Sequence, residues 1–222
     1  MTDHKVSLVG PQTIIGRSLV IHRYEDDLGR GGYRSSRITG HAGSRLGCCI
    51  IERQKTEFIY ARCYMYSDTG EPDQDVEGVI SLKQSVHGGP TEIVVDLDGF
   101  DPDDDDFYHA FHVHERGRLG RRCLNAGGHF NPEGRRHGAP WHADRHVGDL
   151  GNIRENEKGE VKMTIIDRRV SLVGANSVIE KSMVVHARED DMGLGGFPDS
   201  KSTGHAGPRL ACCIIEESSE AG

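Results

Sequence analysis

The sequence has 222 residues, with 27 Lys and Arg against 35 Asp and Glu, so its formal net charge is −8. No apolar run approaches the roughly 20 residues of a membrane-spanning helix, and the polar first residues are not followed by the apolar core of a signal peptide. An acidic chain without a basic tract argues against nucleic acid as the main partner. We therefore expect neither a membrane nor a nucleic-acid partner, and the compartment stays open between cytoplasmic and extracellular.

The first segment of the chain repeats its last part. With an offset of 164 residues, Asp3–Glu52 aligns with Asp167–Glu216, and 29 of these 50 positions are identical. The middle of the chain has no second copy. The repeat predicts a partial domain at residues 1–54 that duplicates 167–216, one complete domain at 55–217 and a tail at 218–222. A piece of a longer tandem array and a duplicated exon would both leave this trace.

The complete domain is predicted to consist of short strands. Six segments are short and rich in β-branched or aromatic residues, as strands are. They are residues 58–66, 76–83, 91–97, 110–114, 161–166 and 182–186. Turn signals separate them, and no stretch sustains a helical period over three turns. We expect an all-β fold, an antiparallel sandwich or barrel with Greek-key connections, and two long functional loops near 117–152 and 187–208.

One predicted strand carries the first candidate metal ligands. His112 and His114 are two residues apart, so alternation turns both imidazoles to the same face of the strand. His186 ends a strand in the repeated segment. It is a candidate to complete an all-imidazole site with that pair, a donor set that suits copper.

The Gly- and Pro-rich loop after that strand carries a second set of candidate ligands. They are His129, His137, His146 and Asp149. Three histidines and one carboxylate suit a closed tetrahedral zinc site, because Zn²⁺ accepts nitrogen and oxygen donors and needs only four neighbours. The two sets together predict a metal-binding protein.

Four segments of the chain resemble the signature segments of the copper/zinc superoxide dismutases. They are His109–Glu115, Gly128–Pro132, Arg145–Asn152 and Gly204–Cys212. The resemblance covers about residues 57–217, and residues 3–52 resemble the last third of the same family. It implies a Greek-key β-barrel with copper and zinc as cofactors. It also implies an enzyme that converts superoxide to dioxygen and hydrogen peroxide by copper redox cycling.

The resemblance assigns a role to each candidate residue. Copper would be bound by His112, His114, His129 and His186, and zinc by His129, His137, His146 and Asp149. His129 would bridge the two metals and, with the active-site Arg209, act in catalysis. Asp190 would join a copper histidine to a zinc histidine by hydrogen bonds. Cys123 and Cys212 match the intrasubunit disulfide of the family. The counterparts in the first segment are His22, Asp26, Arg45 and Cys48.

Other positions depart from the family pattern. Pro198 and Ser202 stand where the family commonly has an acidic residue and a lysine, so we expect weaker electrostatic steering. Cys63 is expected to be a buried free thiol. Cys49 and Cys213 are also expected to be free, with intermolecular disulfides as the alternative.

The duplicated segment leaves assembly and function with alternatives. Residues 1–54 are expected either to pack on a neighbouring molecule in a swapped homo-oligomer or to compete with 167–217 for the same barrel edge. A non-catalytic metal-binding or structural repeat protein on the same fold is the alternative to a dismutase. A third hypothesis, a copper-delivery protein, is weakened because no Met-x-Cys-x-x-Cys segment precedes the complete domain.

Overall fold

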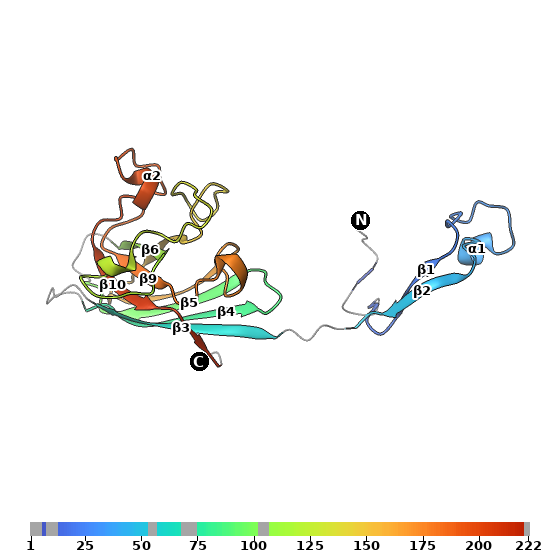
Figure 1. The fold of residues 1–222 in the computed structure, drawn as a ribbon, viewed down its shortest axis with the longest axis horizontal. Helices are drawn as coiled ribbons and strands as arrows, with labels where there is room; N and C mark the ends of the chain where they lie inside the picture. The colour runs from blue at the N-terminus through green and yellow to red at the C-terminus, as the bar shows by residue number, and fades with distance from the viewer. Residues whose placement is uncertain (1–5, 8–12, 53–56, 68–74, 102–106, 220–222) are drawn as a thin grey trace. The chain divides into compact units, whose positions relative to one another are not determined.

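The computed structural model describes residues 6–7, 13–52, 57–67, 75–101 and 107–219 (Figure 1). The chain divides into two compact units, Met1–Lys55 and Thr56–Gly222. Of the predicted tail 218–222, only residues 218 and 219 fall within the described part. No helix in the described ranges is long and apolar enough to span a membrane.

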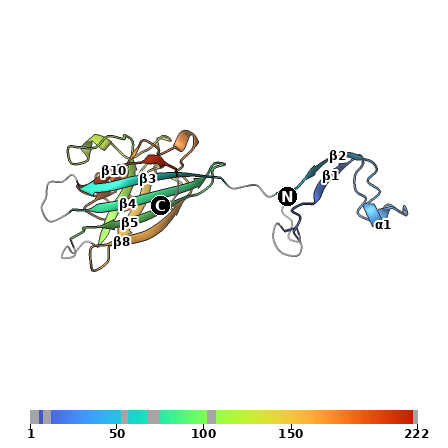
Figure 2. The ribbon, with the colours of Figure 1, turned by 90° about the horizontal axis from the view of Figure 1, so that it is seen from below.

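The larger unit is an antiparallel β-barrel (Figures 1 and 2). Its strands are β3 (Phe58–Ser67), β4 (Glu77–Ser85), β5 (Thr91–Asp98), β6 (Tyr108–His114), β7 (Asp149–Arg154), β8 (Val161–Asp167), β9 (Ser182–His186), β10 (Arg209–Ile214) and β11 (Glu216–Ser218). They lie in the order β7-β6-β9-β10-β3-β4-β5-β8, and β11 pairs with β3. Because β5 to β6 and β8 to β9 connect strands that are not neighbours, the barrel has Greek-key crossovers. The all-β prediction is confirmed.

Alternation along the strands decides which side chains enter the core. In β5, buried and exposed residues alternate strictly from Thr91 to Asp98, as expected for a strand with one face in the core and one in water. In β6, by contrast, every residue after Tyr108 is buried. Phe111 and Val113 belong to the hydrophobic core. His112 and His114, which alternate with them, point to the opposite face, so that face must be covered by something other than the core.

Short one-turn elements interrupt the two long predicted loops. The first loop contains η1 (Leu124–Ala126) and ends in β7, which the six predicted strands omitted. The second contains α2 (Ser200–Thr203) and leads into β10, also omitted. A third one-turn element, η2 (Gly174–Asn176), precedes β9. These loops supply the cover over the outer face of β6.

A buried glutamine ties the start of the β4–β5 turn to the chain that follows β8. Gln84 Nε2 donates a hydrogen bond to the carbonyl of Gly89 at 2.7 Å. Its Oε1 accepts from the backbone N–H of Leu172 at 2.7 Å and from Ser171 Oγ at 3.0 Å. The bond to Leu172 is buried, and the bonds to Gly89 and Ser171 are partly buried.

Replacing Gln84 with leucine is expected to lower the free energy of unfolding by about 2 kcal/mol, because the buried N–H of Leu172 loses its partner. Urea denaturation of the metal-free protein measures this. The exchange Thr164→Leu, at an exposed position of β8, is the control and should stay within about 0.5 kcal/mol of wild type. Equal stability of the two variants would contradict the role of Gln84.

The smaller unit is a two-stranded hairpin. Its strands are β1 (Ser18–His22) and β2 (Arg45–Ile50), and the connection between them contains α1 (Ser36–Thr39). The pairing runs from Ser18 opposite Ile50 to His22 opposite Arg45, with a shift of register before the last pair. In the barrel, β9 and β10 pair from Ser182 opposite Ile214 to His186 opposite Arg209, with a shift at the same place. The repeated sequence therefore adopts the same hairpin in both units.

The cysteine pairing of the barrel corrects one prediction. Cys63 on β3 forms a disulfide with Cys213 on β10, so the expectation that these two thiols are free is wrong. The side chains face each other because β10 lies next to β3 in the sheet and both are buried. Cys49 is exposed and forms no disulfide within the described part of the chain, and the same holds for Cys48.

Candidate metal centre

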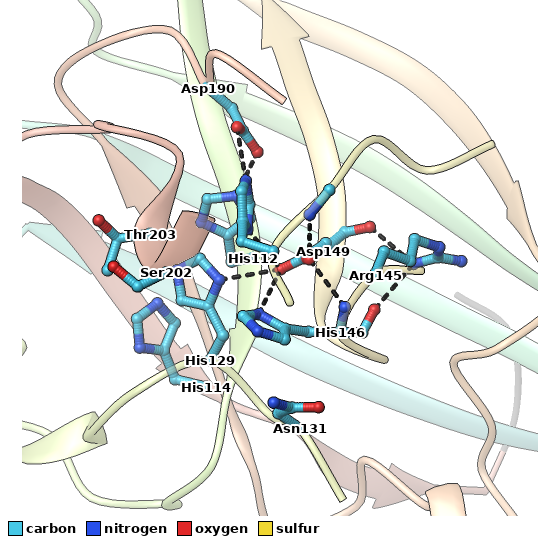
Figure 3. Close-up of polar contacts among 12 residues, drawn as sticks. His112, His114, His129, Asn131, Arg145, His146, Asp149, Asp190, Ser202 and Thr203 are labelled. Carbon is cyan, nitrogen blue, oxygen red and sulfur yellow. Dashed lines mark hydrogen bonds and ion pairs between the residues drawn. The ribbon is translucent and has the colours of Figure 1, made fainter. Parts of the chain in front are cut away.

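The predicted metal ligands lie together between the barrel and its long loops (Figure 3). β6 supplies His112 and His114, and the end of β9 supplies His186. The first long loop supplies His129, which forms an isolated β-bridge with His114, and also His137 and His146. Asp149 begins β7. All seven residues are buried. The histidines of β6 are thus covered by other histidines rather than by apolar side chains.

Four imidazoles form the first cluster, which we call the four-histidine group. It consists of His112, His114, His129 and His186, with one ring nitrogen of each within 4.8 Å of the others. The Nδ1 atoms of His114 and His186 donate to the carbonyls of Gly127, at 2.9 Å, and Gly207, at 3.3 Å. Their Nε2 atoms therefore face the cluster and lie 3.4 Å apart.

The second cluster, the aspartate group, consists of His129, His137, His146 and Asp149. The Nδ1 atoms of the three histidines lie 2.9, 3.0 and 3.1 Å from one carboxylate oxygen, Asp149 Oδ1. The other oxygen accepts from the backbone N–H groups of His146, at 2.9 Å, and Gly138, at 3.1 Å. These backbone bonds fix the carboxylate where the three rings converge. His112 is also close to this cluster: one ligand atom each of His112, His129, His137 and Asp149 lies within 4.8 Å of the others.

Asp190 connects the two groups from the second long loop. Its Oδ2 is 2.8 Å from His112 Nε2 and its Oδ1 is 2.7 Å from His137 Nε2. Asn152 holds the backbone of Asp190 in turn, accepting from its N–H at 2.7 Å and donating to its carbonyl at 3.0 Å. One buried carboxylate thus orients a histidine of each group.

Three histidines of the four-histidine group, His114, His129 and His186, are held neutral. Burial, followed by repulsion from His112, lowers the pKa of His129 to about 3. Burial also lowers the pKa values of His114 and His186 well below the usual histidine range. Neutral imidazoles are the form that coordinates a metal.

In the aspartate group, hydrogen bonds between His137 and the carboxylates favour the charged forms of these side chains. Burial by itself would lower the pKa of His137, but the hydrogen bonds that its ring donates to the carboxylates of Asp149 and Asp190 outweigh burial and raise that pKa to about 9. Burial opposes ionisation of Asp149, yet its hydrogen bonds to three histidines hold its pKa far below the usual range. The aspartate group therefore offers an ionised carboxylate to a cation.

A channel from the surface reaches the four-histidine group. Its walls include His114, His129, His186, Asp199, Thr203 and Arg209. Arg209 donates through Nη1 to the carbonyl of Cys123 and through Nη2 to that of Gly127, both at 2.6 Å. The disulfide Cys123–Cys212, the pair expected from the resemblance, anchors this loop to β10. The guanidinium is thereby held beside the histidines.

Two residues to which the sequence pattern assigned no role position the site. Arg145, which is buried, donates through Nη1 to the Asp149 carbonyl at 2.7 Å and through Nη2 to Asp167 Oδ2 at 2.5 Å. It therefore fastens the aspartate group to the end of β8. Asn152 holds Asp190, as described above. Both lie in the segment Arg145–Asn152, but only the folded chain reveals their partners.

The predicted counterparts in the first segment lie in the hairpin unit. His22 Nδ1 donates to the Gly43 carbonyl at 3.1 Å, and Asp26 Oδ1 accepts from the N–H of Leu28 at 2.7 Å. Arg45 and Cys48 lie on β2. None of the four belongs to a candidate metal group among the described residues.

A β-barrel that carries two adjoining ligand groups, with His129 in both, defines a protein with a two-metal centre. A family model described as copper/zinc superoxide dismutase (SODC) matches residues 1–51 and 76–215. The superoxide dismutase [Cu-Zn] of Candida albicans is 45% identical over 143 residues, covering 64% of this chain and 91% of that protein. Those of Candida glabrata and Cordyceps militaris are 46% and 44% identical over 140 and 143 residues, covering 63% and 64% of this chain and 89% and 91% of those proteins. The chain belongs to the copper/zinc superoxide dismutase family.

The donor atoms of the site fit copper and zinc. His112 Nδ1 and His129 Nε2 are buried and have no hydrogen-bond partner among the residues that the structure describes. Buried polar atoms without partners are rare in folded proteins, and a bound metal would satisfy both. An all-imidazole set suits copper, and three imidazoles with a carboxylate suit zinc.

Proposed function

We propose that residues 55–217 form a working copper/zinc superoxide dismutase, which converts superoxide to dioxygen and hydrogen peroxide. The observation that carries the proposal is the placement of His129. Its Nδ1 lies 2.9 Å from Asp149 in the aspartate group, whereas its Nε2 is an unpartnered atom of the four-histidine group. A single ring with a nitrogen in each group can bridge two metals.

Each cofactor is assigned to one group. We assign copper to His112, His114, His129 and His186, and zinc to His129, His137, His146 and Asp149. Bound copper supplies the one-electron couple that oxidises one superoxide and reduces a second, and bound zinc supplies fixed positive charge on the other side of His129. The remaining chemistry belongs to the side chains.

Arg209 and His129 handle the substrate and its proton. The guanidinium of Arg209 presents positive charge and hydrogen-bond donors to an anion in the channel, which matters in a chain of net charge −8. His129 Nε2 can hold a proton and pass it to the reduced oxygen species, while Asp149 keeps the ring in place through Nδ1. Asp190 fixes the orientations of His112 and His137.

Metal content and superoxide decay, measured on one purified sample, test the proposal. We expect one copper and one zinc in the complete domain and rapid superoxide decay. Metal-free protein should be inactive and recover when both metals are restored. Fully loaded protein without turnover would instead favour the second candidate, a non-catalytic metal-binding or structural repeat protein. The observation that favours this alternative is the repeated hairpin, which carries its own copies of a ligand and a disulfide cysteine.

Adding positive charge beside the channel is expected to speed substrate capture. Thr203 lines the channel, and Figure 3 shows the neighbouring Ser202 beside it. The exchange Ser202→Lys should raise kcat/KM about 2- to 5-fold at low ionic strength, and salt should remove the gain because it screens exposed charges. The control is Ser219→Lys, an exposed position outside the channel walls. A gain that persists in high salt would contradict steering.

We further propose that residues 1–54 are the C-terminal third of a second dismutase domain, as in a tandem-repeat protein. The shared register of β1–β2 and β9–β10 supports this assignment. His22, Asp26, Arg45 and Cys48 would then correspond to His186, Asp190, Arg209 and Cys212. The segment is also the place through which we propose that the chain assembles with another molecule.

A further inference from the structure

The hairpin unit has the same internal contacts as the hairpin β9–β10, which is built into the barrel. Ser36 Oγ donates to Asp27 Oδ2 in one unit, as Ser200 Oγ does to Asp191 Oδ2 in the other. The rings of Tyr33 and His41 stack with centroids 3.9 Å apart, as those of Phe197 and His205 do at 3.8 Å. The two hairpins are thus preorganised alike, including the loops that connect their strands.

The environments of the two hairpins are opposite. Met183 and Val185 of β9 are fully buried, whereas their counterparts Leu19 and Ile21 are 61% and 66% exposed. Leu210 of β10 is buried, and its counterpart Leu46 is 62% exposed. An isolated two-stranded hairpin with apolar side chains in water is marginally stable, and its free edges invite pairing. The apolar side chains that β9–β10 buries in the barrel are therefore exposed to solvent on β1–β2.

The barrel shows what covers such a hairpin. β9 pairs with β6 on one side, and β10 pairs with β3 on the other. Cys212 and Cys213 bond to Cys123 in the first long loop and to Cys63 on β3. We call the space between β6 and β3 the hairpin slot, and the barrel without its hairpin the body. The free thiols of Cys48 and Cys49 occupy the corresponding positions of β2.

The numbers of hairpins and bodies in the chain decide what can cover β1–β2. Each copy of this chain has two such hairpins but, in the part that the structure describes, only one body. Its slot is already filled by β9–β10. Exchange of hairpins between copies would leave one hairpin per chain uncovered, so it buries no additional apolar surface. The complement of β1–β2 therefore has to be a body with an open slot.

We propose that β1–β2 docks into the open hairpin slot of a second dismutase body and completes a second metal site there. The partner carries a strand like β6 with two alternating histidines, and cysteines placed like Cys123 and Cys63. Cys48 and Cys49 form disulfides with those cysteines. Each bond removes two electrons and two protons from two thiols, which a disulfide oxidant such as oxidised glutathione accepts, and this yields two reduced thiols. His22 joins the copper ligands of the completed site.

The probe for the docking experiment is a polypeptide of residues 57–178 of this sequence, which is the body without its hairpin. It is mixed with the intact chain, copper, zinc and oxidised glutathione. We expect a 1:1 complex by native mass spectrometry, disulfides joining Cys48 to Cys123 and Cys49 to Cys63 of the probe, and two coppers instead of one. A peptide of residues 179–217, which contains the missing hairpin, is the positive control: its binding shows that the probe can accept a hairpin.

Two matched variants of the intact chain test the docking face. Ile21→Asp places a carboxylate where Val185 is fully buried in the barrel, so capture should weaken about 100-fold. Ile38→Asp makes the same exchange at a 78% exposed residue whose counterpart, Ser202, is also exposed, so capture should not change. Equal capture by the two variants overturns the proposal. The proposal is also overturned if the peptide of residues 179–217 binds the probe and the intact chain does not.

A measurement on the intact chain without the probe also tests the docking proposal. The intact chain alone should show two thiols that react under native conditions and no disulfide-linked dimer. Absent thiols would mean that two hairpins cover each other, which overturns the proposal. The inference rests on the proposed tandem origin of residues 1–54. Its copper count and disulfide map are independent of turnover, so an inactive enzyme that captures the probe refutes only the dismutase activity.

Discussion

Replacing His112 with alanine is expected to abolish superoxide dismutation and copper binding while zinc stays bound. His112 is fully buried, and its Nδ1 is an unpartnered donor atom of the four-histidine group. Its Nε2 lies 2.8 Å from Asp190 Oδ2, which would lose that partner but keep His137 through Oδ1. The aspartate group therefore keeps its orientation without His112. Copper and zinc analysis combined with a superoxide assay measures both outcomes.

The matched control for this prediction is His142→Ala. His142 lies in the same long loop region as the ligands but is exposed and outside both groups, so metal content and turnover should stay at wild-type values. Asp190→Asn provides an intermediate case, since loss of a residue that orients ligands lowers metal affinity about 10- to 100-fold. Turnover by the His112→Ala protein, or loss of zinc along with copper, would contradict the assignment of His112 to copper alone.

Much of the site follows from local spacing. His112 and His114 had to share a face because they alternate on a strand, and Phe111 and Val113 had to point the other way into the core. Residue type marked the histidines of the following loop as candidate ligands. How each ring presents its nitrogen could not be predicted, because it depends on carbonyls such as those of Gly127 and Gly207, which any residue possesses.

The pairings that sequence reasoning missed are those fixed by strand order. Cys63 and Cys213 are 150 residues apart, and cysteine spacing does not determine connectivity. The pair follows only once β10 is known to lie beside β3, and β10 was absent from the predicted strands. The same holds for Arg145 and Asp167, which meet because the loop before β7 folds onto the end of β8. Long-range register, rather than composition, was the missing information.

Removing the Cys63–Cys213 disulfide by the double exchange of both residues to alanine is expected to lower the stability of the metal-free protein by about 4 kcal/mol. The bond joins β3 to β10, the first and last long strands of the barrel. With Cys123–Cys212 intact, the loop that it closes runs from Cys63 to Cys123 and across that disulfide, about 60 residues. Loop-closure entropy of the unfolded chain then gives about 4 kcal/mol.

The matched control is the double exchange of Cys48 and Cys49 to alanine. It removes the same two residue types from the hairpin unit, where both thiols are free and exposed, so the unfolding of the barrel should not change. Urea denaturation of the metal-free proteins, with and without reductant, measures the difference. In reductant, wild type should lose at least the stability that the Cys63/Cys213 variant lacks, because both disulfides then open. If the variant matches wild type under oxidising conditions, the bond does not constrain the unfolded chain and the closure of the barrel rests on packing alone.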